Sequence, residues 1–291
     1  MKAAGDQTMI LERFAACRST PLIYAVAHAG RGFPQAHRAQ LQANIATLRS
    51  LEDPLVDQLT DGAAALGVAR LVNRTARAFV DVNRDPADID PRLVEDGRGR
   101  ETPRTRAGLG VVPRLGGDGK TLYRGRLDRT EIEGRIHEVH RLYHAELTAM
   151  MHETRTQWGR AVLIDWHSMP SLAAQAEQRR GGMRPDIVLG DRHGQSASSE
   201  IAGVVRAAFE ARGRRVVMNR PFAGGYTTQL WGQPNQSFHA VQVEIDRSLY
   251  LNEETLEPVP GLVRLQADIQ AVGEALIAWL ESKKAAPESA A

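Results

Sequence analysis

Short runs of apolar and β-branched residues recur along the chain, and amphipathic stretches separate them. The runs are nearly continuous rather than alternating, which is typical of strands that are covered by helices on both faces of a sheet. Because helical patterns lie between them, the sequence predicts an α/β fold whose sheet is parallel in large part. The predicted strands are PLIYAVAH (21–28), VARLVNRTARAFVDV (68–82), RAVLIDWH (160–167), PDIVLGD (185–191), RRVVMNRP (214–221) and HAVQVEIDR (239–247).

Amphipathic patterns between these runs predict four helices. The first begins at Asp53, where an aspartate followed by proline is typical of an N-cap and a first helical turn, and it ends at Gly67. The second covers residues 130–159, with apolar residues at helical spacing on one face. Residues 198–213 open with serines and close on glycine, which indicates a third helix. Residues 261–282 form the last one.

Two segments have no regular period and interrupt this alternation. Residues 85–126 contain several prolines, glycines and arginines, and residues 171–185 form a second polar, arginine-rich loop. A long irregular segment inside a domain is often functional, so we expect the first to lie near the site, with a lid as one role open to it, and disorder is the alternative. The sequence predicts a single catalytic domain over residues 1–291, with an irregular excursion at about 85–126 and a frayed tail after about residue 283.

Charge and composition exclude several classes of protein. The formal net charge is +2 and the basic residues are scattered, so we expect neither a nucleic-acid nor a membrane partner. No stretch approaches the roughly 20 apolar residues of a membrane helix, and the N-terminal residues do not resemble a secretory signal. Cys17 is the one cysteine, which excludes an internal disulfide and favours a reducing cytoplasm. A small molecule is the expected partner, and no pattern indicates an oligomeric state.

Two of the nine histidines directly follow an apolar run. His28 in AVAHAGRGFP and His167 in VLIDWHSMPS should therefore lie at the carboxyl ends of strands, the edge of an open α/β sheet where ligands bind. Two imidazoles from neighbouring strand ends can meet at one metal ion, and a carboxylate would complete a site with an open position for water. A structural role for each histidine is the alternative.

Other candidates for catalysis carry less weight. His140 and His144 have the spacing of metal ligands on a helix, but the glutamate of the HExxH pattern is missing and the apolar residues already define a buried stripe. Ser168 lacks the GxSxG elbow of a serine nucleophile, so it is expected to shape the turn after His167.

Two further groups could add chemistry to a metal site. Glu244 lies among alternating apolar residues in HAVQVEIDR, and a carboxylate in such a setting tends to have a raised pKa that suits a general base. An outward-facing residue on a half-exposed strand is the alternative. The segment DVNRDP clusters Asp81, Asn83 and Arg84 at the predicted end of a strand, where arginine and asparagine can capture a carboxylate. A helix cap with a surface arginine is the alternative there.

An ordered set of segments from about Pro21 to Glu253 resembles the N-formylglutamate amidohydrolase family, whose fold is related to the zinc carboxypeptidases. The resemblance implies an α/β three-layer sandwich with a mixed, largely parallel sheet of the zinc-carboxypeptidase-like (phosphorylase/hydrolase-like) type. The matching segments are AHAGRGFP, EDPLVDQL, FVDVNRDP, AGLGVVPR, LYRGRL, YHAEL, AVLIDWHSMPS, RPDIVLGDRHG, AGGYTTQLWGQP and HAVQVEIDRSLYLNE.

The resemblance also implies roles for individual residues. Asn83 and Arg84 would hold the glutamate part of the substrate, as an Asp-x-Asn-Arg segment does in the carboxypeptidase group. His167 would bind the metal together with His28. Glu244 matches the late-strand glutamate that activates water.

The sequence departs from the related pattern at two positions. The carboxypeptidase group has a glutamate ligand three residues after its first histidine, whereas Arg31 stands here. The acidic ligand is therefore expected from EDPLVDQL, with Asp53 preferred and Asp57, one turn on, as the alternative. Trp166 replaces a small residue before the His-Ser pair and is expected to reshape the pocket floor.

The resulting hypothesis is metal-dependent hydrolysis of N-formyl-L-glutamate to formate and L-glutamate, at the end of histidine breakdown. A divalent ion, zinc by preference, lowers the pKa of a bound water, Glu244 takes and returns its proton, and Arg84 or Asn83 stabilises the oxyanion. Arg114 in VVPR is expected to bind the second carboxylate and Tyr226 in FAGGYTTQ to contact substrate. The alternatives are a hydrolase of another N-acyl amino acid or small peptide, and a non-catalytic dicarboxylate-binding protein of the same fold.

Overall fold

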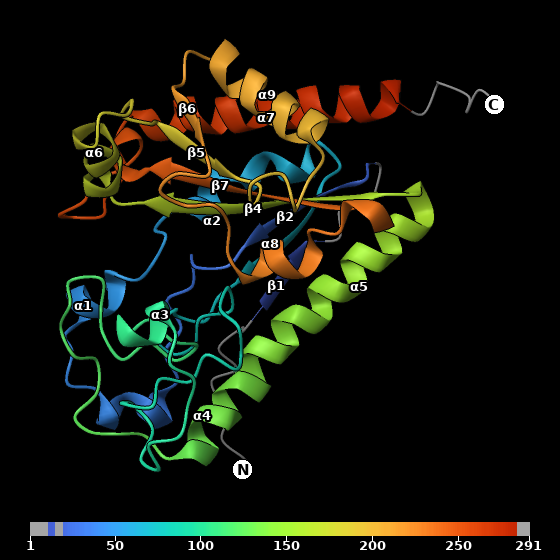
Figure 1. The fold of residues 1–291 in the computed structure, drawn as a ribbon. Coiled ribbons are helices and arrows are strands. Elements are labelled where there is room, and N and C mark those ends of the chain that lie inside the picture. Colours follow the sequence, from blue (N-terminus) through green and yellow to red (C-terminus); the bar gives the residue numbers. More distant parts are fainter. Residues whose placement is uncertain (1–10, 15–19, 284–291) are drawn as a thin grey trace, which may run out of the picture. The chain divides into compact units, whose positions relative to one another are not determined.

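The computed structural model describes residues 11–14 and 20–283, and its main element is a seven-stranded mixed sheet. Cys17 and the predicted tail after residue 283 lie outside the described residues. The strands follow the order β1-β3-β2-β4-β7-β5-β6 (Figure 1). Their bounds are β1 (Leu11–Phe14), β2 (Leu22–Val26), β3 (Ala69–Asn73), β4 (Ala161–Met169), β5 (Ile187–Gly190), β6 (Val216–Met218) and β7 (Phe238–Asp246).

The register of the sheet confirms the prediction of a largely parallel arrangement. β2 pairs with β4, β4 with β7, and β5 with β6 in parallel, while β5 runs antiparallel to β7. Each of the six predicted apolar runs overlaps one of these strands. The α/β class expected from the alternation of strands and helices is therefore confirmed.

The run at 68–82 is a strand only in its first part, so the prediction that Asp81–Arg84 ends a strand is wrong. β3 stops at Asn73, whose side-chain amide donates to the carbonyls of Ala27 and Thr75 and whose side-chain oxygen accepts from the backbone N–H of Thr75. An asparagine that bonds the backbone two residues on closes a turn and ends the ladder. Asp81–Arg84 instead lies in an irregular segment.

The long predicted helices are confirmed at 130–159, 198–213 and 261–282. The first of them is interrupted by the π-turn η3 (Ile136–His140). The helices are α1 (Ile45–Arg49), α2 (Val56–Leu59), α3 (Pro103–Arg106), α4 (Arg129–Arg135), α5 (Arg141–Trp158), α6 (Ser171–Arg179), α7 (Ser199–Ala211), α8 (Tyr226–Trp231) and α9 (Gly261–Ser282), with 3-10 turns η1 (Gln35–Gln40), η2 (Asp61–Ala64), η4 (Pro234–Gln236) and η5 (Arg247–Leu249).

The predicted helix from Asp53 to Gly67 is wrong in its beginning and its continuity. Leu55 adopts a left-handed backbone with φ of 64°, so no helix can pass through it and α2 begins only at Val56. Asp53 is not the N-cap of α2, because Leu55 occupies that position, and the backbone N–H of Asp53 donates to the carbonyl of His28. The hydroxyl of Thr60 bonds to carbonyls of α2 and closes that helix after one turn.

The polar loop predicted at 171–185 contains the helix α6 in its first half. The backbone N–H of Ser171, in the first turn, donates to the carboxylate of Glu253. That carboxylate satisfies a group that the helix itself leaves unpaired. Because the partner is 82 residues away along the chain, no local pattern could indicate this helix start.

The chain divides into two compact units, and the dividing points fall within β1, β3 and α5, at the end of β2 and shortly before α2. Of the described residues, the first unit contains 11–13, Ala27–Asp53 and Leu71–Thr148. The second contains Phe14–Val26, Pro54–Arg70 and the chain from Ala149 onward.

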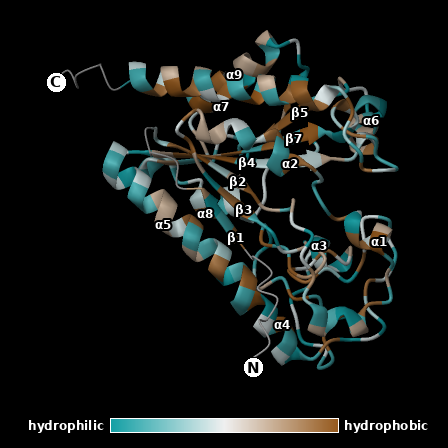
Figure 2. Cartoon of the chain, turned by 180° about the vertical axis from the view of Figure 1, so that it is seen from behind, coloured by the Kyte–Doolittle hydropathy of each residue, from teal (hydrophilic) through white to brown (hydrophobic). Residues whose placement is uncertain are grey.

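The second unit is layered. The helices α7 and α9 cover one face of its strands and α8 lies on the other face (Figure 1). Hydrophobic residues concentrate on β4, β5 and β7 (Figure 2), and their side chains are almost completely buried. Burial of such side chains contributes about 1.5–3 kcal/mol each to stability. This arrangement confirms the layered α/β architecture that the sequence predicts.

The first unit contains the irregular segment 85–126, in which α3 is the one helix among residues that the structure describes. Its loops are held by ion pairs rather than by a regular ladder. Examples are the bonds of Arg100 to Asp85 at 2.9 Å, Arg114 to Asp90 at 2.8 Å and Arg129 to Asp96 at 2.6 Å.

Candidate active site

His28 lies two residues beyond the end of β2 and is held between two carboxylates of the first unit. Its Nε2 lies 2.8 Å from Oδ1 of Asp81, and its Nδ1 lies 3.2 Å from Oδ2 of Asp53. All three side chains are almost fully buried. Buried charges of this kind persist only when they are paired or bind a metal, and the carboxylates of Asp53 and Asp81 supply that pairing for His28.

Asp81 is the residue that fixes the ring of His28. Its carboxylate also accepts from Nε of Arg77 at 2.9 Å, from Nη2 of Arg84 at 3.3 Å and from the backbone N–H of Asn83 at 2.9 Å. Burial alone would raise the pKa of Asp81, but the charges of Arg77, His28 and Arg84 outweigh burial and hold it well below its usual value. An ionised carboxylate behind a histidine sets the tautomer and the orientation of a metal ligand.

Of the two acidic ligands considered, Asp53 is the one that contacts His28. Its carboxylate and its backbone N–H both bond to that residue. Asp57 belongs to α2 of the second unit, where its backbone carbonyl accepts from Arg70. The His28–Asp53 contact therefore favours Asp53 as the acidic ligand.

His167 and Glu244 face the same side of the sheet in the second unit. They are register partners on the parallel strands β4 and β7, and partners on neighbouring strands share a face. Nε2 of His167 lies 3.0 Å from Oδ2 of Asp165, and the amide of Gln242 donates to Oε1 of Glu244 at 2.9 Å. Each of these polar side chains is buried.

Trp166 alternates with His167 and lies on the opposite face of β4. Its ring packs edge-on against Tyr24 and Phe209, with centroids 5.2 Å and 6.4 Å away. The expectation that it reshapes the pocket floor is wrong, because successive strand residues point to opposite faces. Ser168 is engaged as well, since its hydroxyl accepts from Nε of Arg247 at 3.1 Å.

The donor set suits a divalent metal. His28, Asp53 and His167 are buried and each offers one ligand atom. Both histidines turn Nε2 toward a buried aspartate, so Nδ1 is the nitrogen that a metal would take from either ring. Two imidazoles and a carboxylate are the ligand types of hydrolytic zinc sites.

The two orienting aspartates had no role in the sequence prediction. Asp165 precedes His167 by two residues, and the strand period of two could have placed both on one face. The sequence places Asp81 only in a predicted carboxylate-binding cluster. Because Asp81 lies far from His28 along the chain, no local pattern predicts their contact.

The predicted substrate-binding residues differ in how far they are already engaged. Asn83 and Arg84 are buried in the first unit, and burial lowers the pKa of Arg84 to about 10. Nε of Arg84 has no hydrogen-bond partner among the described residues, so it can still donate to a ligand. Arg114 is held through Nε by the buried Asp90 at 2.8 Å. Tyr226, the first residue of α8 in the second unit, is half-buried.

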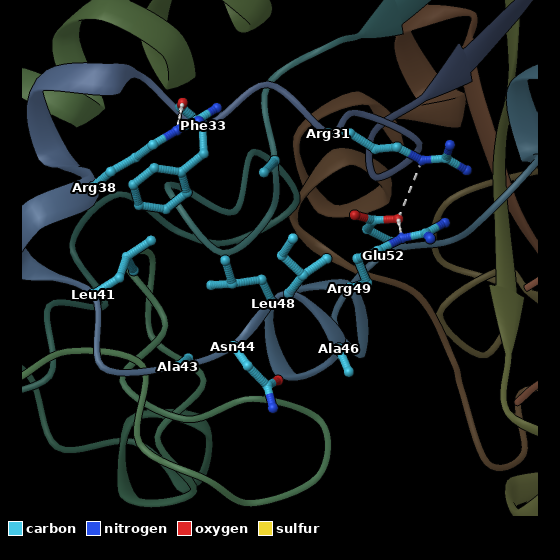
Figure 3. A pocket seen from close by; sticks show the side chains of 12 residues that line it. Arg31, Phe33, Arg38, Leu41, Ala43, Asn44, Ala46, Leu48, Arg49 and Glu52 are labelled. Carbon is cyan, nitrogen blue, oxygen red and sulfur yellow. Dashed lines mark hydrogen bonds and ion pairs between the residues drawn. The ribbon is translucent and has the colours of Figure 1, made fainter. Parts of the chain in front are cut away.

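A hollow of about 830 Å³ opens in the first unit, next along the chain to His28 and Asp53. Figure 3 shows the carboxylate of Glu52 between the guanidinium groups of Arg31 and Arg49 at one end of it. Burial raises the pKa of Glu52 against the lowering effect of both arginines. Arg31, which stands where the carboxypeptidase group has a ligand, thus pairs with Glu52, while the rest of the hollow is largely apolar.

Comparison with known proteins identifies the family. The N-formylglutamate amidohydrolase family matches residues 20–251. N-formylglutamate deformylases of Pseudomonas aeruginosa and Pseudomonas putida are each 31% identical over 268 residues, which is 89% of this chain and 93% of theirs. An N-formylglutamate amidohydrolase from Ralstonia eutropha JMP134 has a crystal structure with a TM-score of 0.81 at 26% identity, covering 94% of this chain and 98% of that one. A gene product from Agrobacterium tumefaciens, at 18% identity and a TM-score of 0.65, shares the fold over 94% of this chain and 96% of its own. The chain therefore belongs to the N-formylglutamate amidohydrolase family.

Proposed function

We propose that this protein hydrolyses N-formyl-L-glutamate to formate and L-glutamate. The relatives named as N-formylglutamate deformylases support the substrate. The observation that carries the chemistry is the buried register pair of Glu244 with His167, because it sets a carboxylate beside a histidine that an aspartate already orients.

The residues that would hold a divalent metal, zinc by preference, are His28, Asp53 and His167. β2 and β4 are parallel neighbours with Ala25 in register with Asp165, which supports the proposal that the chain leaving β2 toward His28 and the end of β4 serve one site. When bound, such an ion is a Lewis acid that lowers the pKa of water toward neutrality and polarises a carbonyl. Asp81 and Asp165 hold the two imidazoles in the tautomer that ligation needs.

Glu244 is the general base and then the general acid. It takes a proton from water as the water oxygen bonds to the formyl carbon, and it delivers that proton to the glutamate nitrogen as the formyl C–N bond breaks. The hydrogen bond from Gln242 to Oε1 holds the carboxylate in one orientation, so less rotational entropy is lost in the reaction.

Asn83 and Arg84 bind the α-carboxylate of the substrate. The unpaired Nε of Arg84 supports this role, since a buried arginine donor gains a charged partner when a carboxylate arrives. Arg84 also stabilises the oxyanion, Arg114 binds the side-chain carboxylate, and Tyr226 completes the substrate contacts. With glutamate as product, the reaction stands at the end of histidine breakdown.

We further propose a domain organisation, a role for residues 85–126 and a location for the enzyme. Both units act together as one catalytic domain, the segment 85–126 serves as a lid, and the enzyme works in the cytoplasm on a small molecule. Among the described residues, no helix is long and apolar enough to cross a membrane.

Formate release from N-formyl-L-glutamate, measured before and after chelation and again after metal is returned, tests the proposal. Activity should vanish on chelation and return with the ion. His167→Ala should abolish metal retention and turnover, while His137→Ala, at an exposed histidine, should change neither. A chelated enzyme that still releases formate at the original rate contradicts the metal, and formate release only from other N-acyl amino acids contradicts the substrate.

A further inference from the structure

Two histidines of the long helix region bond to the backbone that carries the proposed substrate anchor. Nε2 of His140 lies 2.8 Å from the carbonyl oxygen of Arg84, and Nε2 of His144 lies 2.7 Å from that of Val82. The two carbonyls flank Asn83. His140 is buried and His144 is half-buried, and their rings lie with centroids 4.6 Å apart at an interplanar angle of 40°.

The hydrogen bonds have one possible direction. A carbonyl oxygen only accepts, so each Nε2 carries the proton and donates. Burial lowers the pKa of both rings, that of His144 to about 3, and repulsion from His140 in its protonated form adds to the lowering of the pKa of His144. Both imidazoles are therefore neutral at physiological pH, and the donated hydrogen bond places no charge beside the substrate anchor.

The π-turn η3 places this pair. It covers Ile136–His140, between α4 and α5, and inserts one extra residue into the helical repeat. Such turns shift the residues around them relative to the helix face, and they occur frequently at functional sites. His140 is the last residue of the turn, and His144 follows one helical turn later on the same face.

The segment Asp81–Arg84, which carries the proposed carboxylate-binding residues Asn83 and Arg84, needs such support because it has no regular structure of its own. Asp81–Arg84 belongs to neither a strand nor a helix, so no regular ladder fixes its carbonyls. The bonds from His140 and His144 hold the carbonyls on either side of Asn83 to the helix.

We propose that His140 and His144 are positioning residues for the substrate α-carboxylate: by holding the carbonyls of Arg84 and Val82, they fix the direction in which Asn83 and Arg84 point. This inference rests on the proposed function and adds to it two residues that touch neither metal nor substrate. Loss of either bond loosens the carboxylate anchor and leaves the hydrolytic groups in place.

Two substrates that differ only in the α-carboxylate distinguish a positioning role of the histidines from a general loss of folded enzyme. N-formyl-L-glutamate carries the α-carboxylate, and N-formyl-4-aminobutyrate is the same molecule without it. His140→Leu and His144→Leu should raise KM for the first substrate and lower its kcat/KM about 10- to 100-fold, the range expected for one lost buried hydrogen bond. The kcat/KM for the second substrate should change by less than about threefold. Because one enzyme sample serves both assays, a loss of folded protein cancels in the ratio.

Matched variants sharpen the test. His140→Gln and His144→Gln keep an amide N–H at about the reach of Nε2 and should restore the wild-type ratio. His144→Asn, whose amide is shorter, should not restore it, and it replaces His144→Leu if leucine prevents folding. His137→Leu, on the same helical stretch but exposed, should behave as wild type.

The outcomes distinguish this inference from the proposed function. If the wild-type enzyme hydrolyses N-formyl-L-glutamate but the leucine variants lose both substrates equally, the positioning role is wrong and the histidines are only structural. If glutamine fails to restore the ratio while asparagine does, the bonds to the carbonyls are not the cause. If the wild-type enzyme releases no formate from N-formyl-L-glutamate, the proposed function itself fails.

Discussion

Replacing Asp81 with asparagine separates the role of this residue in stability from its role behind His28. Oδ2 of Asp81 accepts from Arg77 and Arg84, and Oδ1 accepts from Nε2 of His28 and the backbone N–H of Asn83. An asparagine keeps one acceptor oxygen and sets an NH₂ group against the donors on its other side. In either orientation two of these hydrogen bonds are lost.

The expected loss in the free energy of unfolding depends on which groups lose their hydrogen-bond partner. Hydrogen bonds to charged groups contribute about 1.5–3 kcal/mol each, and removing one member of a buried ion pair costs about 3–5 kcal/mol. The side chain of Arg77 is 20% exposed, so water compensates part of the loss there, whereas Arg84 is 5% exposed and is left with a buried charge. We expect Asp81→Asn to lower the free energy of unfolding by about 3–4 kcal/mol.

The same change should weaken metal binding. Removing the carboxylate behind a metal-binding histidine lowers affinity by about 10- to 100-fold. Urea unfolding measures the stability loss, and competition with a chelator of known affinity measures metal binding on the folded protein. Formate release gives the effect on turnover.

Asp90→Asn is the matched control. Asp90 is also buried in the first unit and pairs with an arginine, Arg114, at 2.8 Å, and no described bond links it to His28. It should lose stability without the 10- to 100-fold loss in metal affinity. If Asp81→Asn and Asp90→Asn reduce metal affinity equally, or if Asp81→Asn binds metal as wild type does, the orienting role of Asp81 is refuted.

Three further predictions concern catalysis, pH and packing. Glu244→Gln should lower kcat by about 10²- to 10⁴-fold with unchanged metal content, and retained turnover would remove Glu244 from the reaction. Burial would raise the pKa of Asp186, but its hydrogen bonds and ion pair with Arg215 outweigh burial and lower it. A carboxylate with a lowered pKa stabilises the fold at pH values above its unfolded pKa of about 3.9, and this stabilisation is lost as the pH falls through its folded pKa. Arg215→Met should therefore lower the free energy of unfolding at pH 5–7. In urea titrations the difference from wild type should close below about pH 4. Gly30→Ala should lower the Tm, because its Cβ would lie 2.3 Å from the carbonyl carbon of Arg74, and an unchanged Tm would contradict that contact.

Much of the fold follows from local patterns. The six apolar runs each overlap a strand because continuous apolar segments require cover on both faces, which only a sheet between helices provides. The failures occur where the backbone departs from what the local signal predicts. Leu55 adopts a positive φ where Asp and Pro predict a helix start, and the backbone N–H of Ser171 at the start of α6 donates to a carboxylate 82 residues away.

The same distinction separates the two aspartates behind the histidines. Asp165 lies two residues before His167 on one strand, so the period of two puts both side chains on one face, and a reader of the sequence could have paired them. Asp81 lies 53 residues from His28 and comes after a turn that the side chain of Asn73 creates. The local pattern predicts that His28 lies at the edge of the sheet, because the end of a strand can be recognised from the apolar run before it. The carboxylate that sets its tautomer is found only once the path of the intervening chain is known, and for that reason Asp81 rather than His28 is the more informative residue to change.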